Sequence, residues 1–318
     1  MDDLLKKELN SSTIELVGKT RGGVVNNSAV YLTDDGTKYF AKFNTNPETK
    51  AMFFGEKESL LSITATEAIR VPKIIKLVDH PSGHGAVSIM EYLDGLERLS
   101  TEEMWAQLGD RFGKLHSHNI KLLKKKEEST STVHSNESEA VHKFGYHCDT
   151  FLGRFTPGKG WSSSWLEYFS REILKPVFTI IDWEFHDQEV RELWSELQLL
   201  LPKFFQDTEI LPSLLHGDLC VVNVGHIGTE VVTYDAACIY GDAEFDFIQV
   251  YEDDFRSKFH ESFFKAYRQH MPLDKTSENR RKLYHLFSLA IYWIHGHSTL
   301  RDKTAECMHE LIALAKTL

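Results

Sequence analysis

One stretch of the chain reads Leu214-Leu215-His216-Gly217-Asp218-Leu219-Cys220-Val221-Val222-Asn223. A short apolar run, Val231-Val232-Thr233-Tyr234, follows it and ends on Asp235. Asp218, Asn223 and Asp235 thus bring two carboxylates and an amide close together along the sequence. Such oxygen groups are the ligands that Mg²⁺ prefers, so this stretch is a candidate cation site.

The spacing within this stretch points to a particular chemistry. In protein kinases the catalytic loop H-R-D-x-x-x-x-N places a base Asp before a metal-binding Asn, and a second metal-binding Asp follows. The same interval separates Asp218 from Asn223, and Asp235 follows. An ordinary loop is the alternative, with Asp218 capping a turn and Asn223 bonding to backbone. For an isolated D-x-x-x-x-N the ordinary loop would be the favoured interpretation.

A lysine and a glutamate upstream favour the kinase interpretation. Lys42 lies in the middle of the alternating run Tyr39-Phe40-Ala41-Lys42-Phe43, where a charged residue needs a reason. A kinase lysine on a strand reaches the phosphates of ATP and pairs with a helix glutamate. Residues 48–63 have the pattern of an amphipathic helix, and Glu56 within it is suitably placed, with Glu58 as the alternative. A lysine on the solvent face would also fit this run on its own.

Two further segments occur where a kinase would need them. Gly22-Gly23 precedes a hairpin, and backbone N–H groups of such a loop can cover phosphates. The segment from Met90 onward lies where a strand passes into a helical region, a position that commonly binds adenine through its backbone. We therefore predict nucleotide binding by Gly22, Gly23, Lys42, Glu56, Met90, Glu91, Tyr92, Leu93, Asn223 and Asp235.

The order of expected elements predicts the fold class. Residues 2–10 suggest a helix, strands are expected at 29–32, 38–43, 71–75 and 86–90, and the chain beyond residue 95 has mostly helical patterns. Asp34-Asp35-Gly36 marks a hairpin turn. We expect an α+β, bilobal protein-kinase-like fold. It has a small N-lobe (residues 1–92) with an antiparallel sheet and one main helix, and a larger, mostly helical C-lobe (residues 93–318).

Composition limits the possible binding partners and the expected cellular location. The 318 residues are 42% hydrophobic and carry a formal net charge of -11, which suits a globular protein and argues against binding to nucleic acid or anionic membrane. The N-terminus does not read as a signal peptide, and no apolar run would span a membrane. The four cysteines are scattered, so a reducing, cytoplasmic location is expected. Residues 121–140 are Lys-rich, then Ser/Thr/Glu-rich, and we expect a solvated, mobile loop, with a partner-binding segment as the alternative.

From these motifs outward the sequence resembles the fructosamine-3-kinase (ketosamine-3-kinase) family over nearly its whole length, more closely than aminoglycoside or choline kinases. The matching strings are Tyr39-Phe40-Ala41-Lys42-Phe43-Asn44, Met52-Phe53-Phe54-Gly55-Glu56, Arg70-Val71-Pro72-Lys73, Lys143-Phe144-Gly145-Tyr146-His147, Glu192-Leu193-Trp194, Leu214-Leu215-His216-Gly217-Asp218-Leu219 and Tyr240-Gly241. The resemblance implies ATP and Mg²⁺ as cofactors. It also implies phosphorylation at O3 of a sugar-amine adduct, free or on a glycated protein, which destabilises the adduct and repairs the amine. Under it Asp218 is the catalytic base, Asn223 and Asp235 bind the metal, and Lys42 with Glu56 organises the phosphates.

The chain departs from the family pattern on the acceptor side. The family pattern is H-G-D-L-W-x-G-N, whereas Cys220 and Val222 stand at its Trp and Gly positions. In an Asn-rich motif near the C-terminus, Ile291 and Ile294 stand where asparagine is expected. These changes keep open a kinase for a different amino sugar or small alcohol, and a pseudokinase-type scaffold. His116 matches a family Leu-His motif, and we expect it to be a structural hydrogen-bonding residue.

Overall fold

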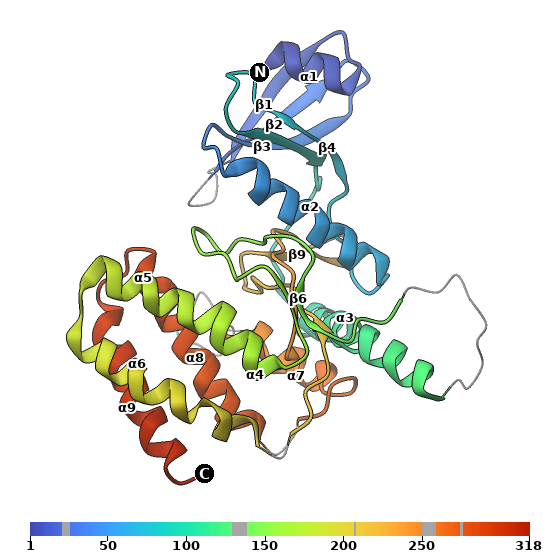
Figure 1. The fold of residues 1–318 in the computed structure, drawn as a ribbon. Helices are drawn as coiled ribbons and strands as arrows, with labels where there is room; N and C mark the ends of the chain where they lie inside the picture. The colour runs from blue at the N-terminus through green and yellow to red at the C-terminus, as the bar shows by residue number, and fades with distance from the viewer. Residues whose placement is uncertain (21–25, 129–138, 207, 250–258, 274–275) are drawn as a thin grey trace.

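The computed structural model describes residues 1–20, 26–128, 139–206, 208–249, 259–273 and 276–318. A twisted sheet and its helices form one end of the molecule and a larger, mostly helical part forms the other (Figure 1). The N-terminus lies beside the sheet and the C-terminus at the far end of the helical part. The predicted bilobal α+β fold is confirmed.

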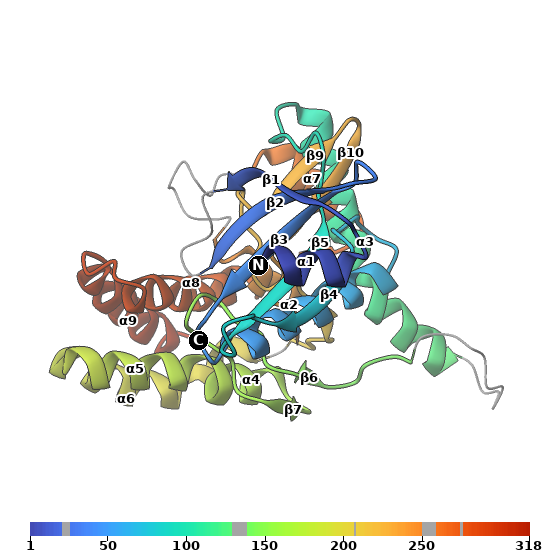
Figure 2. The same cartoon turned by 90° about the horizontal axis from the view of Figure 1, so that it is seen from above.

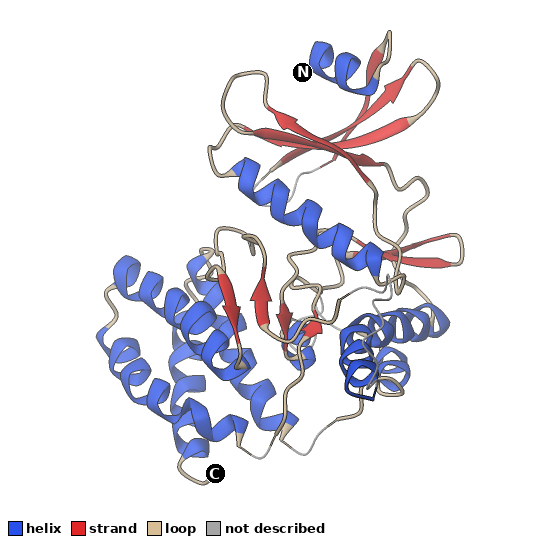
Figure 3. Ribbon diagram, turned by 45° about the vertical axis from the view of Figure 1, so that its right-hand side comes forward, coloured by secondary structure: helices blue, strands red, loops and turns tan. Residues whose placement is uncertain are grey.

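The N-lobe is built on a five-stranded antiparallel sheet in the order β1-β2-β3-β5-β4. Apolar side chains that alternate along its strands, Ala29, Tyr31, Ala41, Val87 and Ile89, are buried together with Leu5 of the first helix. The longer helix α2 lies between the sheet and the rest of the molecule (Figure 3). The elements are α1 (Asp2–Leu9), β1 (Ile14–Thr20), β2 (Asn27–Thr33), β3 (Lys38–Asn44), α2 (Thr49–Ala65), β4 (Ile74–Asp79) and β5 (Ala86–Glu91).

Two strands differ from the sequence prediction. The strand expected at residues 71–75 begins only at Ile74, because Pro72 has no N–H to give to the ladder. β1 was not predicted. Its pairing with β2 shifts register between Leu16 and Gly18, and such an irregularity breaks the alternation by which a strand is recognised.

The prediction of a loop over residues 121–140 was wrong for its first part. Helix α3 runs from Glu102 to Glu128, so residues 121–128 are its last turns. Lys125 and Lys126 lie in the final turn, where cations interact favourably with the helix dipole. The rest of the predicted loop, apart from residues 139–140, lies outside the described residues.

In the C-lobe small sheets lie beside helices that pack on one another. A four-stranded sheet has the order β7-β6-β11-β8, and β9 pairs with β10 in a separate hairpin. Helix α3 packs on α7, and α8 packs on α5 and α9. From above, α5, α6, α8 and α9 gather on one side, and α3 extends on the other (Figure 2). The elements are β6 (Phe144–Tyr146), β7 (Gly160–Ser162), α4 (Trp165–Tyr168), α5 (Lys175–Phe185), α6 (Gln188–Leu200), β8 (Ser213–Leu214), β9 (Val224–Ile227), β10 (Glu230–Thr233), β11 (Tyr240–Gly241), the 3₁₀ turn η3 (Ala243–Phe247), α7 (Glu261–Tyr267), α8 (Ser277–Ile294) and α9 (Leu300–Ala315).

A buried polar network fixes α8 against the start of η3. The Asp242 carboxylate accepts hydrogen bonds from Arg280 Nε at 2.8 Å and from the Tyr284 hydroxyl at 2.7 Å. Tyr284 in turn accepts a bond from Trp165 Nε1 at 2.8 Å. Because a buried charge needs such partners, this network holds η3 in one position on α8. Among the described residues, no helix is long and apolar enough to cross a membrane.

Close backbone contact at Gly55 is needed to place helix α2. A Cβ built on Gly55 would lie 2.1 Å from the backbone oxygen of Asp149, which has no freedom to move aside as a flexible side chain would. We predict that Gly55→Ala lowers the free energy of unfolding by about 2 kcal/mol or more, because the helix must shift away from the C-lobe. Urea denaturation measures the change.

Gly18→Ala is the matched control for this substitution. A Cβ at Gly18 meets only the Val30 side chain, at 3.7 Å, which is ordinary contact. Its free energy of unfolding should stay within about 0.5 kcal/mol of wild type. Equal stabilities for the two variants would contradict the close-contact account.

Candidate active site

Lys42 joins the two lobes through two carboxylates. It lies on β3 between β2 and β5, and its Nζ is 2.6 Å from Glu56 Oε1 on α2. The same Nζ also contacts Asp235 Oδ1 in the C-lobe. The side chains of Lys42 and Glu56 are only 13% and 11% exposed. The lysine therefore does not lie on a solvent face, and its partner is Glu56. The alternative, Glu58, contacts His147 and Lys57.

These three groups perturb one another's ionisation. Burial by itself would lower the pKa of Lys42, but the Glu56 and Asp235 carboxylates raise it above its ordinary value. Burial raises the pKa of Glu56. The pKa of Asp235 is lowered in spite of burial, because Lys42 favours its charged form. Lys42 is thus a permanent cation, as a group that binds phosphates must be.

Asp235 and Asn223 lie at the open end of the β9–β10 hairpin. Val224 pairs with Thr233, and Tyr234 N donates to Asn223 O at 3.1 Å. Asp235 follows immediately in the left-handed region, with φ 58°, which Asp tolerates better than most residues. The hairpin is what brings the two predicted metal ligands together.

The loop that was predicted to be catalytic is built around the Asp218 carboxylate. Asn223 Nδ2 donates to Asp218 Oδ2 at 2.9 Å, and Gln249 Nε2 donates to Asp218 Oδ1 at 2.7 Å. Burial raises the pKa of Asp218, and these two donors partly offset that rise. His216 Nδ1 accepts from Asp218 N at 3.3 Å while its Nε2 faces Tyr234 O at 3.1 Å. This pattern suits a neutral imidazole with the proton on Nε2, and burial lowers the pKa of His216 accordingly.

A second buried carboxylate supports this loop from below. Asp246 in η3 accepts the backbone N–H groups of His216 at 2.7 Å and Gly217 at 2.8 Å. It also contacts His116 Nε2 at 3.0 Å, and the other ring nitrogen of His116 faces the Tyr267 hydroxyl. His116 is fully buried and holds Asp246, as the expected structural hydrogen-bonding residue would.

Only glycine fits at position 217 of this loop. Its φ is 83°, and a Cβ there would lie 1.9 Å from the backbone oxygen of Ala237. The loop and the segment after Asp235 are in turn bonded to each other, since Ala237 N donates to His216 O at 2.8 Å and Leu215 N donates to Ile239 O at 2.9 Å. The H-G-D sequence therefore reflects a close approach of two backbones.

Four residues depart from the family pattern on the expected acceptor side, and three of them are buried. Ile291 and Ile294 are 7% and 3% exposed and belong to the main hydrophobic core. Cys220 is also buried, whereas Val222 is 56% exposed. Isoleucines packed in the core offer no hydrogen bond to a sugar, so these two positions do not replace the polar groups expected there.

Of the two segments predicted to bind the nucleotide, the structure describes the connector but not the glycine loop. Met90 and Leu93 are buried, and the Glu91 carboxylate pairs with Arg70 at 2.7 Å. The backbone N–H of Glu91 donates to Lys73 O, so it is already engaged. Nucleotide binding by Met90, Glu91, Tyr92 and Leu93 stays a prediction. Gly22 and Gly23 lie outside the described residues.

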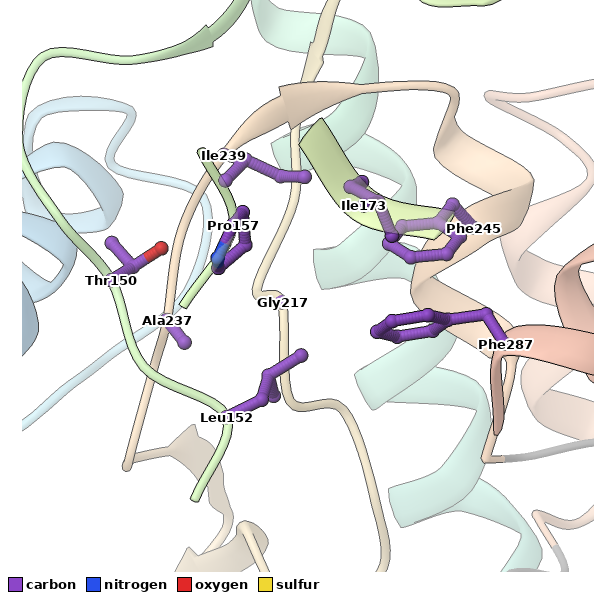
Figure 4. A pocket seen from close by; sticks show the side chains of 9 residues that line it. All are labelled: Thr150, Leu152, Pro157, Ile173, Gly217, Ala237, Ile239, Phe245 and Phe287. Atoms are coloured by element: carbon purple, nitrogen blue, oxygen red, sulfur yellow. The ribbon is translucent and has the colours of Figure 1, made fainter. Parts of the chain in front are cut away.

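A small apolar hollow opens beside Gly217 (Figure 4). Apolar side chains line most of it, among them Leu152, Ile173, Phe245 and Phe287. With so few polar groups it cannot neutralise a triphosphate, so it is not the nucleotide site.

The oxygen atoms available at this site indicate which kind of cation it could bind. Both hydrogen bonds from Asn223 to Asp218 use Nδ2, which leaves the Asn223 carbonyl oxygen as the atom that can ligate a cation. Among the described residues, no cluster of three or more His, Cys, Asp or Glu could hold a metal ion. Two oxygen ligands from protein suit Mg²⁺, which is usually bound by one or two side chains together with substrate phosphates and water.

Sequence reasoning missed Asp246, Gln249 and Tyr292. Asp246 interrupts an apolar run, Phe245-Asp246-Phe247-Ile248, and a buried acid of that kind is a usable signal. Gln249 and Tyr292 carry no comparable signal, because only the fold brings them to Asp218.

The fold is protein-kinase-like. It brings together a strand lysine paired with a helix glutamate, a loop carboxylate and two oxygen-bearing side chains on a hairpin, which is the arrangement expected of a phosphotransferase. Solved structures share the fold. A candidate fructosamine-3-kinase from Thermobifida fusca has a TM-score of 0.77 at 18% identity, covering 98% of each chain. The aminoglycoside phosphotransferase APH(4)-Ia, in a ternary complex with AMP-PNP and hygromycin B, has a TM-score of 0.64 at 12% identity, covering 98% of this chain and 97% of that one.

Sequence comparison identifies the family. The profile of the family described as fructosamine kinase matches residues 1–313. The ketosamine-3-kinase of Mus musculus is 34% identical over 98% of this chain and 99% of its own. The chloroplastic protein-ribulosamine 3-kinase of Arabidopsis thaliana is 30% identical over 88% of this chain and 77% of its own. This chain belongs to the fructosamine kinase family, as the resemblance in its motifs predicted.

Asp246 should be important for stability and not only for geometry. We predict that Asp246→Asn lowers the free energy of unfolding by about 3 kcal/mol at neutral pH, because an amide cannot accept all the donors that now meet the carboxylate. Urea denaturation measures this. Comparable stability of wild type and variant would contradict it.

We also predict that Asp246→Asn changes how the free energy of unfolding depends on pH. Burial would raise the pKa of Asp246, but His116 holds it below the ordinary value of 3.8. Its contribution to stability is therefore fully present above the unfolded pKa and is lost as the pH falls through the folded pKa. In an acid titration of stability, the wild type should lose this increment and Asp246→Asn should not.

Proposed function

We propose that this protein transfers the γ-phosphoryl group of ATP to the 3-hydroxyl of a ketosamine, a sugar joined to an amine as a free adduct or on a glycated protein. The convergence of Lys42, Glu56 and Asp235 beside the Asp218 loop is the observation that carries the proposal. The relatives named ketosamine-3-kinase and protein-ribulosamine 3-kinase support this choice of acceptor.

Each side chain has a role in this proposal. Lys42, held by Glu56, binds the phosphates, and Asp218 orients the acceptor hydroxyl and takes its proton. Asn223 and Asp235 would hold Mg²⁺, whose charge offsets that of the transferring phosphoryl group. The nucleotide lies between residues 1–92 and residues 93–318, with its adenine at Met90–Leu93.

The biological setting forms part of the same proposal. Phosphorylation at O3 destabilises the sugar-amine adduct, so the enzyme would act in deglycation and protein repair. We propose a cytoplasmic location. Cys148, Cys220, Cys238 and Cys307 are all free, which suits a reducing compartment.

A panel of acceptors tests the activity. Purified protein with ATP and Mg²⁺ should phosphorylate at least one of fructosamine, ribulosamine and erythrulosamine. Asp218→Asn should reduce kcat by at least about 100-fold, because the general base is lost, while ATP binding stays near wild type. Radiolabel transfer and nucleotide titration measure the two effects.

The matched control is Asp79→Asn at an exposed aspartate that pairs with Lys50 on the N-lobe surface. It should leave kcat within about twofold of wild type, because exposed ion pairs contribute little. A product from another amino sugar or alcohol, with no ketosamine phosphate, would favour a different acceptor. No transfer to any acceptor would favour a nucleotide-binding scaffold.

The metal assignment has its own test. Asp235→Asn should raise the Mg²⁺ concentration needed for half-maximal activity by about tenfold or more, because a neutral amide is a weaker ligand than a carboxylate. A Mg²⁺ titration at saturating ATP measures the shift, with Asp79→Asn again as the control. An unchanged Mg²⁺ requirement would remove Asp235 from the metal site.

A further inference from the structure

Gln249 connects the Asp218 carboxylate to helix α8. Its Nε2 donates to Asp218 Oδ1 at 2.7 Å, and its Oε1 accepts from the Tyr292 hydroxyl at 2.9 Å. All three side chains are partly buried. A hydrogen-bonded chain thus runs from α8 through one amide to the carboxylate at the centre of the site.

The direction of these hydrogen bonds is self-consistent. An amide has a donor end and an acceptor end, and an ionised carboxylate accepts hydrogen bonds only. The NH₂ group of Gln249 must therefore face Asp218, because a reversed amide would place its oxygen against the Asp218 oxygen with no proton between them. Oε1 is then left to accept from the Tyr292 hydroxyl. Tyr292 therefore holds the far end of the amide and limits its movement.

The position of Gln249 is fixed from both ends of α8. Arg280 and Tyr284, early in the helix, bind Asp242 at the start of η3. Tyr292, near the end of the helix, binds Gln249 just after η3. Ile291, Trp293 and Ile294 on the same turn are buried. Tyr292 therefore links this turn of α8 to the active site through Gln249.

The two donors on Asp218 hold its carboxylate in one rotation. Asn223 binds one oxygen and Gln249 binds the other. Each carboxylate oxygen has two lone pairs, so each can still accept a hydrogen bond from the hydroxyl of the substrate. A base held in this way needs no reorientation before the proton is transferred. Asn223 is also the proposed cation ligand, whereas Gln249 is the donor supplied by the helical side of the lobe.

We propose that Gln249 is a positioning residue for phosphoryl transfer, which sets the rotation of the Asp218 carboxylate, and that Tyr292 acts through Gln249. The inference rests on the proposed function for the role of Asp218 as base. It predicts an effect on the rate of the chemical step and little effect on the binding of either substrate.

The test compares Gln249→Met, Tyr292→Phe and the double variant. Gln249→Met keeps the side-chain length and removes the donor, and kcat should fall about 10- to 100-fold, as for loss of a hydrogen bond to a charged group. Tyr292→Phe should lower kcat about three- to tenfold, because the amide remains but can turn. The KM values for ATP and acceptor should stay within about threefold of wild type.

The kcat of the double variant shows whether Tyr292 acts through Gln249 or whether the two residues act independently. If Tyr292 acts through Gln249, the double variant should have the kcat of Gln249→Met alone. Gln188→Met on α6 and Tyr168→Phe on α4 are the matched controls. Gln188 bonds within its own helix to Glu192, and the Tyr168 hydroxyl bonds to Gly158 O. Both controls should retain wild-type kcat.

Three results would overturn the inference: a wild-type kcat for Gln249→Met, losses that multiply in the double variant, or an effect confined to the KM for the acceptor. If the wild type phosphorylates no ketosamine, the proposed function fails separately. A crystal structure of Gln249→Met then decides the positioning role. The Asp218 carboxylate should rotate away from its wild-type orientation, and an unchanged carboxylate would contradict the proposal.

Discussion

The ammonium group of Lys42 has to satisfy two carboxylates that belong to different lobes, and the rest of the site depends on this arrangement. A buried cation is stable only with partners, and Glu56 and Asp235 supply them. The pairing requires β3, α2 and the β9–β10 hairpin to meet at one point. Gly55 allows α2 to approach the C-lobe backbone closely enough for that meeting.

The Asp218 loop is held by a second set of polar contacts that lies beneath it. Asp246 binds two successive backbone N–H groups of the loop and is itself held by His116. The same short element η3 begins at the Asp242 network and leads to Gln249. This short 3₁₀ element therefore supports both the backbone of the loop and the Asp218 side chain. A change in the packing of α8 would be transmitted to both.

The nucleotide side and the acceptor side of this site have different characters. In the proposed function, the charges and oxygen ligands that phosphoryl transfer needs would come from Lys42, Glu56, Asn223 and Asp235. On the acceptor side, Cys220, Ile291 and Ile294 are buried apolar residues. The Asp218 carboxylate instead receives a polar contact from Gln249, which Tyr292 supports. Gln249 and Tyr292 are thus tied to Asp218, the proposed base.

The sequence by itself determined the kinase-like class and the family. It also singled out Lys42, Glu56, Asp218, Asn223 and Asp235 as candidates, and the structure brings them together in two contacting groups. Those residues lie in local patterns, a strand, a helix and a loop with fixed spacing, which can be recognised without knowing the fold. It also indicated the β2–β3 hairpin through its turn residues. It did not indicate β1, where a register shift hides the alternation, or the helical continuation over residues 121–128, where composition resembles that of a loop.

Only the tertiary structure decided the roles of Asp246, Gln249 and Tyr292. Their function consists of contacts with segments far away in the chain, and no local pattern encodes which distant group a side chain will meet. The same holds for the choice of Glu56 over Glu58, because both lie on one helix and the packing of that helix selects which of them faces Lys42. Local propensity and spacing specify the elements and the candidate chemistry, while long-range packing specifies which groups share a proton, a charge or a hydrogen bond.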